Sequence, residues 1–138
     1  MKKAIGYVRS AVKEPADGLK LYKQEIEIGL YCKQNNLELL HVFTDNGASG
    51  SNLKRAGWRA LENHLEKYKG SIEYLIVPDL DRISRDVMSY LSEIKRLEKG
   101  YGVIVKTVLE PILMKREKIH LLHGQRPRKN KLQSRQKP

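Results

Sequence analysis

Short apolar runs alternate with segments of helical periodicity along most of this chain. The strand-like runs are residues 3–9, 37–43, 74–77 and 102–108, and a segment of helical spacing lies between each pair. Successive parallel strands need long crossover connections, which are usually helices. The alternation therefore predicts an α/β fold, with a mostly parallel sheet of four to five strands and helices on both faces.

Residues recur at intervals of three or four in each of these intervening segments, which predicts three helices. The residues at this spacing are Leu19, Tyr22, Ile26, Leu30 and Lys33 in the first helix, the apolar stripe Trp58, Leu61, Leu65 and Tyr68 in the second, and Val87, Leu91, Ile94 and Leu97 on one face of the third. We expect Trp58 and Tyr68 to be core residues rather than residues that stack on nucleic acid, since they share one stripe.

The net charge of +11 is concentrated at the C-terminal end. Residues 111–138 carry nine Lys or Arg and a single acidic residue, and they include few apolar residues after Gly124. We therefore expect one folded domain over residues 1–110 and a disordered basic tail over residues 111–138. Such a tail favours a polyanionic partner, and basic residues such as Arg126, Arg128 and Lys129 are expected to contact phosphates of that partner.

The composition argues against several classes of protein. The single cysteine, Cys32, excludes an intramolecular disulfide and fits a reducing compartment. No apolar run approaches the ~20 residues of a membrane span, so a cytoplasmic protein without a membrane partner is expected. The histidines are dispersed and there is no glycine-rich nucleotide fingerprint, so we expect no metal, no cofactor and no small-molecule substrate.

The stretch from Pro78 to Asp86 follows the third strand and precedes the third helix. In open α/β sheets, ligands bind at the carboxyl ends of the strands. Arg82 and Arg85 lie three residues apart and would share one face of a helical turn, beside Asp81. Two guanidiniums in this arrangement can bind a phosphate.

Other polar groups should converge at the same sheet edge: Arg9 and Ser10 after the first strand, the loop 45–52, and Arg55. A hydroxyl nucleophile surrounded by guanidiniums suits phosphoryl transfer, since the arginines can stabilise the charge that develops on the phosphate oxygens. The alternative is that these arginines are solvated or ion-paired, as arginines at helix starts often are.

The ordered set of motifs resembles the catalytic domain of the serine recombinases, the resolvase/invertase family. The resemblance rests on residues 4–10, Gln24, residues 45–50, Arg55 and residues 80–85, and it covers about residues 2–110. It implies that a serine attacks a DNA phosphodiester, leaving a 5′-phosphoserine link and a free 3′-hydroxyl, without metal or nucleotide cofactor.

By the same resemblance, Arg9, Arg55, Arg82 and Arg85 would contact the scissile phosphate. Asp81 would orient an arginine or shuttle a proton, and Gln24 would support the site. Ser10 is the candidate nucleophile, but the family's usual string is Tyr-x-Arg-x-Ser, and Ala11 occupies the serine slot here. Neighbouring residues of a strand face opposite sides, so Ser10 would point away from Arg9 unless the backbone turns there.

The family resemblance implies DNA as the partner, with a homodimer, a tetramer or a full-length recombinase completing the assembly. No long helix or helix-turn-helix pattern follows the sheet, so the tail is expected to reflect a truncated or frameshifted gene, with a native basic arm as the alternative. Two other functions stay open. One is a non-catalytic DNA-binding remnant. The other is a phosphate-binding signalling domain, less favoured because the first strand ends in Val8-Arg9-Ser10 without paired acidic residues.

Overall fold

A computed structural model of the chain describes residues 1–15, 18–47 and 55–109. The elements are β1 (Lys2–Ser10), α1 (Leu19–Gln34), β2 (Leu37–Asn46), α2 (Ala56–Lys67), β3 (Tyr74–Val77), the 3-10 turn η1 (Leu80–Arg82), α3 (Val87–Tyr101) and β4 (Ile104–Thr107). The four strands in these ranges form one parallel sheet in the order β2-β1-β3-β4. The predicted α/β architecture is confirmed.

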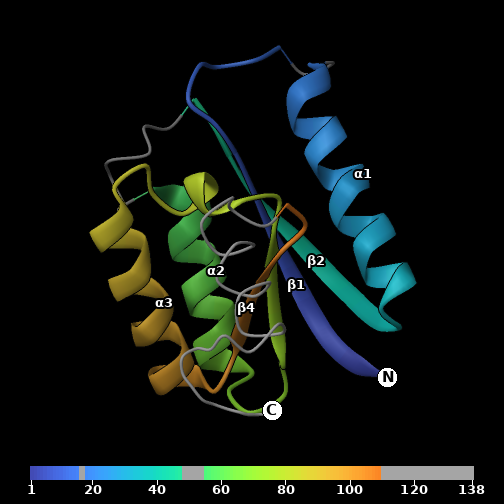
Figure 1. Ribbon diagram of the computed structural model, residues 1–138, viewed down its shortest axis with the longest axis vertical. Coiled ribbons are helices and arrows are strands. Elements are labelled where there is room, and N and C mark those ends of the chain that lie inside the picture. The colour runs from blue at the N-terminus through green and yellow to red at the C-terminus, as the bar shows by residue number, and fades with distance from the viewer. Residues whose placement is uncertain (16–17, 48–54, 110–138) are drawn as a thin grey trace, which may run out of the picture.

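Helices cover both faces of the sheet, with α1 on one face and α2 and α3 on the other (Figure 1). On the α1 face, Ala4 and Val8 of β1 pack with Ile28. On the opposite face, Ile5 and Tyr7 of the same strand pack with the first turns of α2. Since β1 is central and covered on both faces, all of residues 4–10 are buried.

Strand β2 runs three residues further than its apolar run predicts, to Asn46. Its last residues pair with the end of β1, Arg9 with Asp45 and Ser10 with Asn46. Sheet pairing extends the strand into the polar loop, and it places the Asp45 side chain, which is buried, beside the start of α2.

The first predicted helix is confirmed as α1, but the residues whose spacing predicted it do not mark the face that packs on the sheet. The stripe of Leu19, Tyr22, Ile26 and Leu30 is exposed to solvent, and the helix instead buries Gln24, Ile28 and Cys32. Both faces of this helix carry apolar residues at helical spacing, so periodicity cannot choose between them. Burial of Gln24 is compensated because its amide pairs with the backbone of β1.

Only part of the residue set that predicted α3 packs against the rest of the fold. Val87 and Leu91 are exposed, whereas Leu97 is buried and Ile94 is partly buried. The buried face of α3 instead includes the carboxylate of Glu93. Sequence patterning assigns this residue to solvent, but it is only 8% exposed. For α2 the expected buried residues Trp58, Leu61 and Leu65 are confirmed, and only Tyr68, just beyond the helix end, is exposed.

No helix within the described ranges is long and apolar enough to cross a membrane. The loop segment 48–54 and the whole of the predicted tail, with Arg126, Arg128 and Lys129, lie outside the described residues.

Candidate functional site

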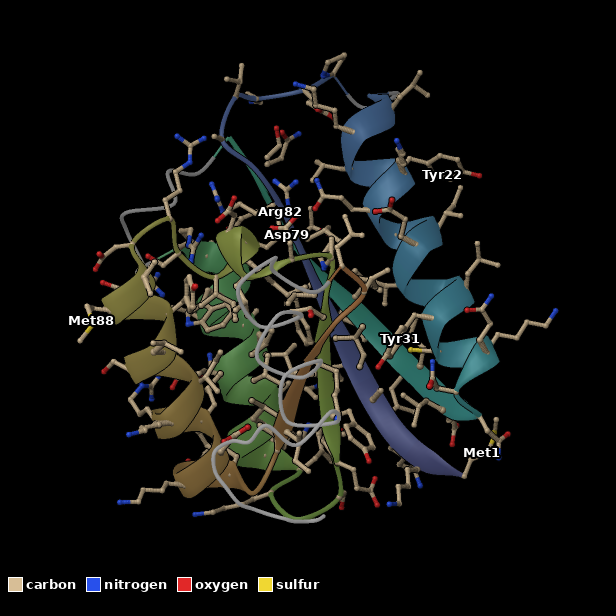
Figure 2. All side chains as sticks on the ribbon, in the orientation of Figure 1. Met1, Tyr22, Tyr31, Asp79, Arg82 and Met88 are labelled. Carbon is tan, nitrogen blue, oxygen red and sulfur yellow. The ribbon has the colours of Figure 1, made fainter. Side chains whose placement is uncertain are left out.

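A cleft of 460 Å³ opens where β1 and β3 end and α1 begins. Its cationic lining consists of Arg9, Lys20, Lys23, Arg82 and Arg85, against the carboxylates Glu27 and Asp79. Ser10, Ala11 and Gln24 also line it. Figure 2 shows Arg82 and Asp79 next to each other between α1 and the other two helices. The cleft therefore combines a hydroxyl group with an excess of positive charge at the carboxyl end of the sheet.

The guanidinium of Arg9 binds the backbone of η1. It is 1% exposed, and it donates from Nε to the Arg82 carbonyl oxygen at 3.1 Å and from Nη2 to the Asp81 carbonyl oxygen at 2.6 Å. Burial lowers the pKa of Arg9, and the nearby charge of Arg55 lowers it further. Arg9 thus brings a buried positive charge to the site while it fixes η1 against β1.

Arg55 also donates hydrogen bonds to the backbone at the end of η1. It is the residue that precedes the first turn of α2, and its Nη2 donates to the Ile83 carbonyl oxygen at 2.6 Å and its Nη1 to that of Arg82 at 3.3 Å. Its guanidinium carbon lies 5.6 Å from the ring centre of Tyr7 and 5.8 Å from that of Trp58, within cation–π range.

Arg82 completes a reciprocal link with β1. Its Nη1 donates to the Arg9 carbonyl oxygen at 3.2 Å, while Arg9 donates to the carbonyl of Arg82. Its Nη2 also lies 3.7 Å from the carboxylate of Asp79, a half-exposed ion pair. The Nε of Arg82 is buried without a hydrogen-bond partner among the described residues. The Arg82 side chain as a whole is 29% exposed and lines the cleft, so its terminal nitrogens can donate there.

Gln24 fixes the end of β1 to α1. Its Oε1 accepts a hydrogen bond from the Arg9 backbone N–H at 3.1 Å, and its Nε2 donates to the Arg9 carbonyl oxygen at 3.1 Å. Both polar groups of the buried amide are used, so the strand cannot shift relative to the helix without breaking two hydrogen bonds.

Ser10 lines the cleft from the end of β1 and is 6% exposed. Its Oγ donates a hydrogen bond to the Val12 carbonyl oxygen at 2.5 Å, across the turn that begins at Ala11. Ala11, in the slot where the related motif has serine, is exposed and also lines the cleft.

The structure brings Arg9, Ser10, Gln24, Arg82 and Arg85 together around the cleft, and Arg85 is solvent-exposed there. Arg55 and Asp81 do not line it. Arg55 is buried behind η1, and Asp81 has an exposed side chain while its carbonyl accepts from Arg9.

Sequence reasoning missed the specific role of Asp45. Its carboxylate accepts from the Tyr7 hydroxyl at 2.7 Å and from the backbone N–H groups of Gly57 and Trp58 at 2.8 and 2.9 Å. It therefore supplies the N-terminal cap that α2 lacks within its own sequence. Burial raises the pKa of Tyr7, and its hydrogen bond to Asp45 raises it further.

The charged cleft residues Asp79, Glu27, Lys20 and Lys23 were also missed. The lysines could have been found from their spacing, because residues one and four positions before Gln24 lie on or beside its face at the start of the same helix.

Among the described residues, no group of three or more His, Cys, Asp or Glu side chains is arranged to hold a metal ion.

Comparison with known proteins gives a family match over residues 4–123, to the model described as "Resolvase, N terminal domain". The chain belongs to the resolvase N-terminal domain family. The predicted serine recombinase family, and with it the function class of a catalytic domain in DNA recombination, is confirmed.

Solved structures agree with this family. The N-terminal catalytic domain of TP901-1 integrase is 25% identical, with a TM-score of 0.69 and 78% of each chain covered. A resolvase family site-specific recombinase from Streptococcus pneumoniae is 21% identical, with a TM-score of 0.64 over 78% of this chain and 72% of that one. A serine recombinase from Sulfolobus solfataricus is 22% identical, with a TM-score of 0.56 over 94% and 91%. The last two likenesses show the shared fold. No curated protein sequence matches the chain.

Proposed function

We propose that this resolvase-family domain cleaves and rejoins DNA through a phosphoserine intermediate formed at Ser10. The observation that carries the proposal is the single cleft in which the Ser10 hydroxyl and the arginines Arg9, Arg82 and Arg85 meet. A DNA phosphodiester is an anion whose negative charge grows as a nucleophile adds to phosphorus, and fixed guanidiniums stabilise that growth.

In the proposed reaction, the Ser10 oxygen attacks the phosphorus and the bond from phosphorus to the 3′-oxygen breaks. The serine loses its proton, the 3′-oxygen gains one, and the 5′-phosphate remains attached to Ser10. Rejoining reverses these steps when a 3′-hydroxyl of the recombining strand attacks the phosphoserine. No oxidant, reductant or nucleotide is consumed. Asp81 is proposed to orient an arginine, since its carbonyl oxygen accepts a hydrogen bond from Arg9 Nη2 at 2.6 Å.

We assign the arginines to two layers. Arg82 and Arg85 contact the scissile phosphate, since both line the cleft, the Arg82 side chain is 29% exposed and Arg85 is exposed. The phosphate then replaces Asp79 as the partner of Arg82, whose present ion pair spans 3.7 Å. Arg9 and Arg55 contribute positive charge from behind and fix the turn on which Arg82 lies.

Lys20 and Lys23 extend the cationic wall along the first turns of α1. We assign them to flanking phosphates of the same DNA strand, where contacts raise affinity without selecting sequence. The proposed working form is a dimer or tetramer, or an assembly with a full-length recombinase, acting on DNA in the cytoplasm.

The reaction requires Ser10 to leave the hydrogen bond that it makes with the Val12 carbonyl oxygen. DNA binding in the cleft would shift the turn that begins at Ala11 and free the hydroxyl for attack. The test is a DNA substrate nicked opposite the scissile bond, which traps the covalent protein–DNA adduct. We expect an adduct with the wild type and with Ser92→Ala, an exposed serine on α3, and none with Ser10→Ala. Equal adduct from all three proteins would remove Ser10 from its role.

A further inference from the structure

A buried carboxylate joins α2 to α3 behind the cleft. Glu93 of α3 is 8% exposed, and its Oε2 accepts a hydrogen bond from the indole Nε1–H of Trp58 at 3.0 Å. Arg96, one turn further along α3, donates to both oxygens of the same carboxylate at 2.9 and 2.5 Å. The charge of Glu93 is thus compensated by one bidentate arginine and one neutral donor.

The network continues to a second carboxylate on α2. Arg96 Nη1 donates to Glu62 Oε2 at 2.8 Å, and the Tyr101 hydroxyl donates to the same oxygen at 3.1 Å. The hydrogen bond from Arg96 lowers the pKa of Glu62, and the hydrogen bonds that Arg96 donates to Glu93 and Glu62 raise the pKa of Arg96. The network therefore fixes α2 and α3 relative to each other at several points.

Trp58 connects this network to the arginine site. Its indole is 1% exposed and packs edge-on against Tyr7, with ring centres 4.9 Å apart. The Arg55 guanidinium lies over these two rings and donates to the carbonyls of Arg82 and Ile83. The ring orientation of Trp58 therefore determines the surface on which Arg55 rests.

An acidic residue at this buried position needs an explanation. A buried ion pair seldom stabilises a protein more than a well-packed apolar residue of similar volume, because both charges lose their hydration. A leucine at position 93 would continue the apolar face of α3, but it could not accept a hydrogen bond from the indole. A carboxylate at position 93 therefore contributes a directional hydrogen bond, which fixes the plane of the Trp58 ring.

We infer that Glu93 is a positioning residue for the phosphate site: it fixes the Trp58 indole and, through that ring, holds Arg55 against the turn that carries Arg82. Its link to DNA rests on the proposed function. The inference makes α3 part of the site although no residue of this helix lines the cleft. It also predicts that Glu93 affects DNA binding through geometry rather than through its charge.

The chain offers a direct reporter, since Trp58 is its one tryptophan. We would record the fluorescence of Trp58 in the free full-length protein, and then DNA affinity from the anisotropy of a labelled duplex. The variants are Glu93→Leu, which removes the acceptor, and Glu93→Gln, which keeps an acceptor for the indole. Glu98→Leu is the matched control, because Glu98 is an exposed carboxylate on the same helix.

With Glu93→Leu we expect a shifted Trp58 emission and DNA binding weaker by about tenfold, the effect of one misplaced charge-assisted contact. Glu93→Gln should keep both the emission and most of the affinity, and Glu98→Leu should match the wild type in emission. Unchanged emission and affinity in Glu93→Leu would overturn the inference, as would an equal loss in Glu93→Gln and Glu93→Leu.

If Glu93→Leu does not fold, Trp58→Phe removes the indole donor while keeping a ring under Arg55. The inference then predicts weaker DNA binding for Trp58→Phe with folded-state circular dichroism retained, and unchanged binding overturns it. If the wild type binds no DNA at all, the proposed function fails, whereas the emission of the free variants still tests the positioning of the ring.

Discussion

The start of α2 lies so close to the end of β2 that a single methyl group at Gly57 should disrupt it. An alanine Cβ at this position would lie 2.2 Å from the Thr44 carbonyl oxygen and 2.9 Å from the Asp45 carboxyl carbon. The first contact is with backbone, so no side-chain rotation can relieve it. The helix must move away from the strand.

The size of the effect follows from the contacts that this movement breaks. The Gly57 and Trp58 N–H groups donate to the Asp45 carboxylate at 2.8 and 2.9 Å, and a displacement of about 1 Å takes such bonds beyond useful range. Hydrogen bonds to charged groups contribute about 1.5–3 kcal/mol each, so the loss in unfolding free energy should be about 3 kcal/mol. For a domain of this size that lowers Tm by about 10 °C.

The assay is urea denaturation followed by circular dichroism, with Gly29→Ala as the matched control. Gly29 lies within α1, and a Cβ there meets nothing within 4 Å. That variant should gain about 0.5–1 kcal/mol from improved helix propensity. Because Arg55 precedes the same turn of α2, Gly57→Ala should also weaken DNA binding. If Gly57→Ala were as stable as the wild type, the close approach of α2 to β2 would be refuted.

Three further outcomes are expected. Ala11→Ser in the Ser10→Ala background places an exposed hydroxyl in the cleft and should restore adduct on nicked DNA; absence of adduct would show that this slot is out of reach of the phosphate. Replacing both Lys20 and Lys23 by Gln should reduce the slope of log affinity against log salt by about 0.9 per lost phosphate contact, and an unchanged slope would place DNA elsewhere. Burial lowers the pKa of His64 below its ordinary value of 6.5, so the folded protein binds fewer protons than the unfolded chain. Stability should therefore fall as the pH drops below that value, and His64→Phe should lose less stability over the same range; parallel curves would contradict this.

The parallel sheet and its alternation with helices could be predicted because buried parallel strands are nearly continuous apolar runs, as 74–77 is, and helices must separate them. The packing faces of α1 and α3 could not be predicted with the same rule. In α1, the glutamine on the buried face is satisfied by the backbone of Arg9, and in α3 the buried carboxylate is satisfied by Trp58 and Arg96. Arg9 and Trp58 are distant in sequence from the residues that they satisfy, so patterning treats Gln24 and Glu93 as solvent-facing.

In the candidate site, too, some features could be predicted from the sequence and others depend on tertiary contacts. The convergence of Arg9, Ser10 and Arg82 follows from parallel topology, which brings strand ends to one edge. Whether a guanidinium faces the cleft or the backbone depends on the carbonyls of η1, and the sequence contains no signal for that geometry. Hence Arg55 lies behind the turn, and the cleft gains Lys20 and Lys23 instead.

The most direct test of the account is to map the covalent attachment site. The adduct on nicked DNA would be digested with nuclease and protease, and the peptides sequenced by mass spectrometry. The account predicts a phosphoryl-linked nucleotide remnant on Ser10 in the peptide that contains Arg9 and Ala11. A remnant on any other residue, or a DNA complex with no covalent remnant, would contradict it.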